Sequence, residues 1–283
     1  RHAFPAETNV LSDDPKDRDG DWFAEPTQEF KDLKRDLYKK EEGREFTTNV
    51  KKMAMKLGKF FLGAGVATLV YTYLNTTMMG RTSFIGPNNM KHTYKSPNPA
   101  YNVDRRAEAV STDTIFSDVP AICTGDKAAQ IYCGVESKFL EAYGCKTDGE
   151  FTGTLQENIT RHGAPYMLIS DRARAVLSNA TKDLLRLYMI KDWQSEPHYQ
   201  NQNYVESEIG RMKPKVLQLL NTAGAPPSAW LLALKHLCNI NNVTARKSLG
   251  WRTPHEVLYG ITPDISPFMQ FCWWQPCYCK VYD

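Results

Sequence analysis

The run Ser111-Thr112-Asp113-Thr114-Ile115-Phe116 is rich in β-branched residues and contains one carboxylate. Such a run is typical of a strand. A second run, Leu168-Ile169-Ser170-Asp171, ends a further predicted strand on another aspartate. If the two strands are neighbours in the middle of one sheet, their carboxylates converge at the same edge of that sheet.

The segments around these two runs alternate between strand-like and helix-like patterns. Helical spacing of Phe151, Leu155 and Ile159, closed by Gly163, predicts a helix between the third and fourth strands. We expect strands at 111–117, 128–134, 139–145, 166–170 and 189–193, and helices at 149–162, 179–188, 204–220, 228–243 and 253–259. This order predicts an α/β fold, a mixed five-stranded sheet with flanking helices.

A third carboxylate, Glu206, enters from the helix that follows residues 195–203. Three oxygen ligands on rigid elements suit a pair of Mg²⁺ ions about 3.5–4 Å apart, the arrangement used for in-line phosphoryl displacement. Two competing acids fit less well. Asp118 lies beyond the first strand, and Glu208 lies about 200° around the helix from Glu206, so we expect Glu208 to face away.

The sequence motifs around these carboxylates resemble those of integrases of copia-like LTR retrotransposons, particularly the divergent group found in diatoms. The resemblance covers about residues 108–283. The resemblance is carried by Ser111-Thr112-Asp113-Thr114, Ile169-Ser170-Asp171, Glu196-Pro197-His198, Gln202-Asn203, Val205-Glu206, Arg211, Ala229-Trp230 and Thr253-Pro254-His255-Glu256. The 34 residues between Asp171 and Glu206 are close to the spacing that names the D,D,E superfamily.

The resemblance implies an RNase H-like fold and a DNA-joining enzyme, a polynucleotidyl transferase of the integrase or endonuclease type located in the nucleus. It implies Asp113, Asp171 and Glu206 as catalytic residues and ligands of Mg²⁺ or Mn²⁺. DNA would be the partner, and a homo-oligomer is expected. The residues in contact with DNA would be Tyr199, Gln200, Asn201, Gln202, Arg211, Lys213 and Lys215. For the three bases, a solvated helix face remains the alternative.

Several departures from that family pattern predict impaired activity. A zinc module of two His and two Cys precedes the core in such integrases, whereas here only His2 and His92 lie upstream and no cysteine precedes Cys123. Two arginines, Arg172 and Arg174, crowd the second aspartate. Pro214, eight residues after Glu206, is expected to break or kink the helix.

No zinc site is expected at the C-terminal cysteines either. Cys272, Cys277 and Cys279 have no fourth ligand nearby. Tryptophans and a tyrosine are interleaved with them, which favours a β-strand. The seven cysteines of the chain form no small disulfide framework, so we expect a reduced, intracellular protein.

The N-terminal third has a different character. We expect residues 1–50 to form an acidic lead-in followed by a charged helix. Residues 51–80 form a candidate membrane helix, because positions 60–80 hold no charged side chain and four lysines precede them. A buried or interfacial helix is the alternative. We expect a linker at 81–110, the catalytic core at 111–260 and the start of a truncated C-terminal β segment at 261–283.

Two functions therefore stay open. The first is the integrase-like enzyme. The second is a non-catalytic accessory subunit of an organellar membrane complex, anchored to the membrane or to membrane-protein subunits through residues 51–80. The net charge of +3 favours neither, since residues 111–283 contain equal numbers of acids and bases.

Overall fold

The computed structural model describes residues 52, 58–77, 97–170, 178–194 and 204–277. The chain divides into two compact units. One unit is continuous and comprises residues 92–242. The other combines residues 1–91 with residues 243–283. Asp171 and the predicted DNA-contact loop at 199–202 lie outside the described residues.

The continuous unit is built on one five-stranded sheet. Its strands are β1 (Arg105–Phe116), β2 (Ala128–Gly134), β3 (Leu140–Cys145), β4 (Ala164–Ser170) and β5 (Lys191–Gln194), in the spatial order β3-β2-β1-β4-β5. β2 is antiparallel to β1 and β3, whereas β4 and β5 run parallel to β1. The predicted α/β class with a mixed five-stranded sheet is confirmed.

β1 begins at Arg105, inside the stretch expected to be a linker. Its first six residues lack a strand-like sequence pattern because they are rich in charge. The structure accommodates that charge by pairing Arg105 and Arg106 with the start of β4 and by burying Arg106 in an ion pair with Glu108. Buried charges that are paired in this way are compatible with a central strand.

Two helices cover one face of the sheet. They are α4 (Phe151–His162), introduced by a 3-10 turn at Asp148–Glu150, and α5 (Asn179–Leu187). The hydroxyl of Ser178 caps α5 by accepting the N–H of Thr181. The core on this face comprises Val110, Tyr132, Tyr143, Phe151, Leu155, Ile159, Ala164, Leu168, Leu184, Leu185, Tyr188 and Ile190.

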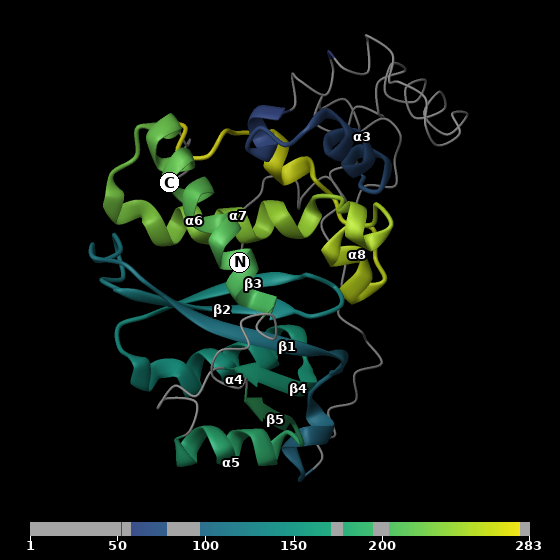
Figure 1. Cartoon of the computed structure of the whole chain (residues 1–283), viewed down its shortest axis with the longest axis vertical. Helices are drawn as coiled ribbons and strands as arrows, with labels where there is room; N and C mark the ends of the chain where they lie inside the picture. Colours follow the sequence, from purple (N-terminus) through teal and green to yellow (C-terminus); the bar gives the residue numbers. More distant parts are fainter. Residues whose placement is uncertain (1–51, 53–57, 78–96, 171–177, 195–203, 278–283) are drawn as a thin grey trace, which may run out of the picture. The chain divides into compact units, whose positions relative to one another are not determined.

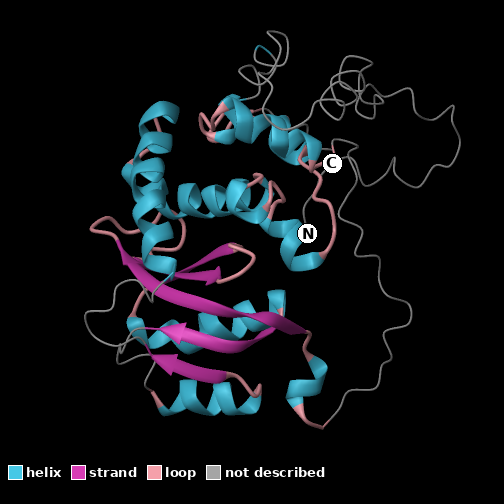
Figure 2. Cartoon of the chain, turned by 45° about the vertical axis from the view of Figure 1, so that its right-hand side comes forward, coloured by secondary structure: helices cyan, strands magenta, loops and turns pink. Residues whose placement is uncertain are grey.

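The opposite face carries α6 (Tyr204–Ala223) and α7 (Trp230–Val243), as Figure 1 shows. α6 lies against β1 and β2. Short 3-10 turns at Pro99–Asn102 and Pro227–Ala229 precede β1 and α7. The view coloured by secondary structure shows the same layering, with helices on both sides of the strands (Figure 2).

Pro214 was expected to break or kink α6, and it does not break the helix. The helix runs for 20 residues with this proline inside it. Pro214 lacks one backbone donor, but Ile209 and Met212 before it and Leu219 and Leu220 after it are buried. Packing on both sides of the proline therefore keeps the helix continuous, since tertiary contacts supply most of a helix's stability in a protein.

The second unit brings the candidate membrane segment together with the chain after α7. Its elements are the 3-10 turns Lys59–Phe61, Lys247–Leu249 and Ser266–Met269 and the helices α3 (Val66–Leu74) and α8 (Pro254–Tyr259). Within this unit, the rings of Tyr71 and Trp251 stack with centroids 4.0 Å apart. The Asn75 side chain donates to the carbonyl of Trp251, and Thr72 accepts the N–H of Ala245.

The expectation of a membrane helix over residues 51–80 is not met in the described part of the chain. α3 has nine residues. None of the described helices combines the length and the apolar character needed to cross a membrane. The polar end of the segment stops the helix, because the Asn75 side chain bonds both Tyr71 and Trp251.

The region expected to start a C-terminal β segment is described as far as residue 277. There it contains the 3-10 turn Ser266–Met269 and one isolated parallel bridge, between Thr77 and Asp264.

Candidate active site

Asp113 lies in β1 opposite Ile131 of β2 and is half-buried. Side chains alternate along a strand. Val110 belongs to the core under α4 and α5, so Thr112 and Thr114 face that side, whereas Ser111, Asp113 and Ile115 face the side of α6. One carboxylate oxygen of Asp113 accepts the backbone N–H of Thr114 at 2.7 Å.

On the face of β1 opposite to Asp113, Thr112 and Thr114 form a polar brace with Gln130 of β2. Thr114 donates its hydroxyl to the amide oxygen of Gln130 at 2.6 Å, and the amide nitrogen of Gln130 donates to the Thr112 hydroxyl, also at 2.6 Å. Thr112 in turn donates to the carbonyl of Ile131. These bonds restrain the backbone on both sides of Asp113. A strand-like sequence pattern does not indicate this brace, because it does not specify which side chains meet across neighbouring strands.

The second predicted carboxylate follows β4 directly. The parallel register of β1 and β4 pairs Thr112 with Ser170. The end of β4, after which Asp171 comes next in the sequence, is therefore hydrogen-bonded to the strand that holds Asp113. This is the pairing of neighbouring strands that the sequence argument required.

The third predicted carboxylate, Glu206, is the third residue of α6 and is exposed. The packed stripe of the helix comprises Val205, Glu208, Ile209 and Met212. Glu208, which was expected to face away from the direction of Glu206, lies on this packed stripe: it is 6% exposed and its carboxylate lies 3.2 Å from the guanidinium of Arg211. Glu206 lies on the flank of the stripe.

The predicted DNA-contact bases are all exposed on α6 but do not form one row. Arg211 and Lys215 are four residues apart and share a face, whereas Lys213 lies about 200° away from each. Arg211 is engaged by Glu208.

The start of α6 has a contact that the sequence argument did not find. The ammonium of Lys138, in the turn between β2 and β3, lies 4.8 Å from the centroid of the Tyr204 ring. A cation over an aromatic face is attracted by the ring quadrupole. Because the two residues are distant in sequence, no local pattern indicates this contact, which ties the first turn of α6 to the sheet.

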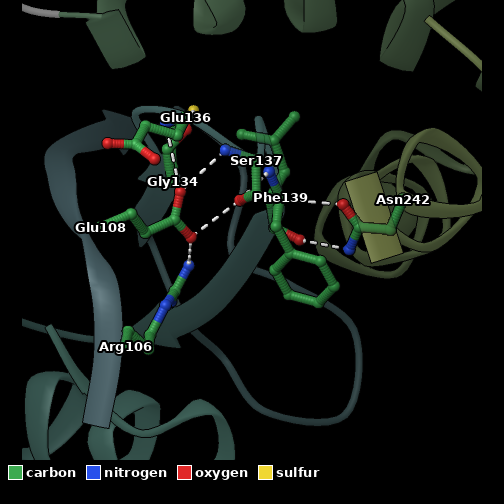
Figure 3. A network of polar contacts seen from close by, with 9 residues as sticks. Arg106, Glu108, Gly134, Glu136, Ser137, Phe139 and Asn242 are labelled. Atoms are coloured by element: carbon green, nitrogen blue, oxygen red, sulfur yellow. Dashed lines mark hydrogen bonds and ion pairs between the residues drawn. The ribbon is translucent and has the colours of Figure 1, made fainter. Parts of the chain in front are cut away.

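The N-terminal end of β1 is anchored by a buried carboxylate, shown in Figure 3. Glu108 pairs with Arg106 and accepts the hydroxyl of Ser137 at 2.8 Å. It also accepts the backbone N–H groups of Glu136 and Ser137, at 3.1 and 2.8 Å. A side chain at Gly134 would meet this carboxylate at 2.5 Å, so glycine keeps the anchor open.

The carboxylates fit a hard divalent cation by donor type, since Mg²⁺ and Mn²⁺ prefer oxygen ligands. Among the described residues, however, no group of three His, Cys, Asp or Glu side chains could hold a metal ion. The structure thus brings the elements of Asp113 and Glu206 together and gives no position for Asp171.

Comparisons with known proteins identify no family for this chain. No protein-family model matches the sequence, and no curated protein matches it. Two solved structures of the HTLV-2 integrase catalytic core domain in complex with magnesium, in trimeric and dimeric forms, are 16% and 17% identical in sequence. Each match covers 54% of this chain and 97% of the viral domain, with TM-scores of 0.44 and 0.42.

The magnesium and the oligomeric forms are properties of those viral domains. The chain is similar in structure to those viral domains over 54% of its length, and its relation to retroelement integrases stays a prediction.

Proposed function

We propose that residues 92–242 form a metal-dependent polynucleotidyl transferase that trims and joins DNA ends. The observation that carries the proposal is the Thr112–Ser170 pairing, which sets the strand of Asp113 beside the strand that precedes Asp171. α6, the helix of Glu206, packs on the same β1 strand. Asp113 and Glu206 thus belong to elements that contact each other, and Asp171 follows β4 in the sequence.

Asp113, Asp171 and Glu206 are the proposed ligands of Mg²⁺ or Mn²⁺. Asp113 is half-buried and oriented by the N–H of Thr114, and Glu206 is exposed. Both side chains supply carboxylate oxygens, the ligand type that these cations prefer. The chemistry that such an ion supplies when bound is activation of the attacking oxygen and stabilisation of the leaving oxygen. The protein would hold the three carboxylates in place and orient the phosphodiester of the DNA.

The DNA contacts proposed around these carboxylates are of two kinds. Arg211, Lys213 and Lys215 are exposed cations on α6 and suit phosphate oxygens. Tyr199, Gln200, Asn201 and Gln202 precede the same helix in sequence and are proposed to contact the DNA end.

The test is strand transfer by the full chain. A fluorescent duplex with a recessed 3′ end is incubated with target DNA in Mg²⁺, in Mn²⁺ and in EDTA. We expect product only with a divalent metal. Asp113→Asn and Glu206→Gln should each lower the rate by at least about 100-fold, as removal of a group that stabilises the transition state does. Asp118→Asn, an exposed acid beyond β1, is the matched control and should keep the rate.

Circular dichroism of each variant separates lost chemistry from lost folding. Metal-dependent strand transfer that survives Asp113→Asn would remove the case for this site. A second comparison distinguishes the two glutamates of α6. Glu208→Gln should lower the thermal midpoint but keep activity at low temperature, because Glu208 is buried and ion-paired. Loss of activity in Glu208→Gln with full activity in Glu206→Gln would reassign the third ligand.

A further inference from the structure

β5 lies at one edge of the described sheet, and its two faces differ in chemistry. Because side chains alternate along a strand, Lys191 and Trp193 share one face, and Asp192 and Gln194 share the other. The amide of Gln194 donates to the carboxylate of Asp192 at 3.3 Å, which keeps the two polar side chains together. The strand therefore presents a cation and an indole on one face and its only acid on the opposite one.

The face of Lys191 and Trp193 is the face of Asp113. Across the three parallel strands the register aligns Ser111 of β1 with Ile169 of β4, and Ile169 with Trp193 of β5. Neighbouring strands are about 4.8 Å apart, so Trp193 lies roughly 10 Å across the sheet from β1. Asp113 follows Ser111 by two residues and points to the same side. Trp193 is thus within about one to two nucleotides' length of the carboxylate.

Trp193 is 37% exposed, although it lies next to a buried isoleucine. Lys191, two residues before it, is also exposed. An exposed aromatic ring beside a cation is the combination that binds single-stranded nucleic acid: the ring stacks on a base and the ammonium contacts the phosphate. Because Asp192 faces the other side, it does not oppose an approaching phosphate on this face.

We infer that Trp193 stacks on an unpaired base at the DNA end and that Lys191 contacts the adjoining phosphate. This inference rests on the proposed DNA-end function and names the part of the substrate that this face binds. No strand of the described sheet lies beyond β5, so a strand of DNA can pass over the indole from this edge. The ligand is an unpaired terminal nucleotide of a duplex, held in the frayed state next to Asp113.

The experiment measures binding without catalysis. Duplexes with 2-aminopurine in a three-nucleotide single-stranded end, or in a fully paired end, are titrated with the full chain in EDTA. Stacking on Trp193 should quench the fluorescence of the unpaired base. Trp193→Ala should weaken binding of the frayed duplex by about 5- to 100-fold and remove the quenching. Trp193→Phe should restore most of both, and binding of the paired duplex should change little in either variant.

Trp274→Ala is the matched control, because Trp274 has a similar exposure, 40%, and lies in the other unit. It should bind both duplexes like the wild type. Lys191→Ala should weaken binding and reduce its salt dependence while keeping the quenching. Asp113→Asn should keep both binding and quenching in EDTA. Intact quenching by the wild-type chain together with no strand transfer by the wild-type chain would count against the enzyme activity alone.

Two results would overturn the inference. One is unchanged affinity and quenching in Trp193→Ala. The other is a change of oligomeric state, seen by sedimentation, in which the wild type is a dimer and Trp193→Ala a monomer that still binds the frayed duplex like the wild type. That outcome would assign the β5 edge to a second copy of this chain.

Discussion

Asn242 of α7 bonds both backbone groups of Leu140 in β3. Its side-chain nitrogen donates to the Leu140 carbonyl at 2.7 Å, and its oxygen accepts the Leu140 N–H at 2.8 Å (Figure 3). β3 is the last strand at one edge of the sheet, so this amide occupies the position of a neighbouring strand's backbone. An edge that is satisfied in this way is less open to pairing with another chain.

Replacing Asn242 by alanine should destabilise the continuous unit by about 2–4 kcal/mol, because two buried backbone groups of Leu140 lose their partner. Urea unfolding followed by circular dichroism measures the change. Asn242→Leu separates the hydrogen bonds from the volume, since leucine fills the space without a polar atom. It should be destabilised by a similar amount, and a leucine variant as stable as the wild type would contradict this account.

Removal of the Glu108 carboxylate should be among the most damaging single changes in the sheet. Glu108→Ala leaves the buried Arg106 guanidinium and two N–H groups without this acceptor, at a cost of about 3–5 kcal/mol. In a double-mutant cycle with Arg106→Met, we expect a coupling energy of at least about 1 kcal/mol. Additive effects of the two single variants would show that the ion pair contributes nothing of its own.

The stacked rings of Tyr71 and Trp251 predict that residues before the linker contribute to the stability of the second unit. Trp251→Ala should destabilise it by about 2 kcal/mol, since the pair contributes stacking beyond its buried area. Trp251→Phe should retain part of that stabilisation. Limited proteolysis reads out the effect as faster cleavage between residues 58 and 77. Equal cleavage rates in wild type and Trp251→Ala would argue against this packing.

Burial of His236 predicts an acid-dependent loss of stability. Burial lowers the pKa of its imidazole below the usual 6.5. As pH falls below about 6.5, the unfolded chain takes up the proton before the folded chain does, so the free energy of unfolding decreases. His236→Gln should remove this part of the decrease between about pH 6.5 and 5 and change little above pH 7.5. Urea midpoints at several pH values measure it.

Glu141 should contribute a pH dependence of stability opposite in sign to that of His236. Burial raises the pKa of this carboxyl, so the folded chain binds the proton more tightly than the unfolded chain does. The protonated carboxyl therefore contributes to the free energy of unfolding at low pH, and this contribution is lost as pH rises. Glu141→Gln should therefore make the decrease on acidification steeper. A shallower decrease in that variant would contradict the assignment of the two groups.

The order and type of most elements could be predicted from the sequence because they depend on local patterns. The strand at Ala128–Gly134 has the predicted bounds, and the helix at Phe151–His162 follows the spacing of its apolar residues. The strand assignment of Asp113 rests on the same kind of signal. Whether Asp113, Asp171 and Glu206 act together remains a prediction, since the position of Asp171 is not described.

What only the tertiary structure decided concerns residues that meet from distant parts of the chain. The charged start of β1 is a strand because Glu108 forms an ion pair with Arg106 and accepts the backbone N–H of Ser137 in the turn after β2. Pro214 stays inside a helix because packing on either side holds it. Glu208 rather than Glu206 lies on the packed face of α6. Periodicity determines which elements form, whereas strand register, buried ion pairs and contacts such as Asn242 with Leu140 depend on partners that no local pattern specifies.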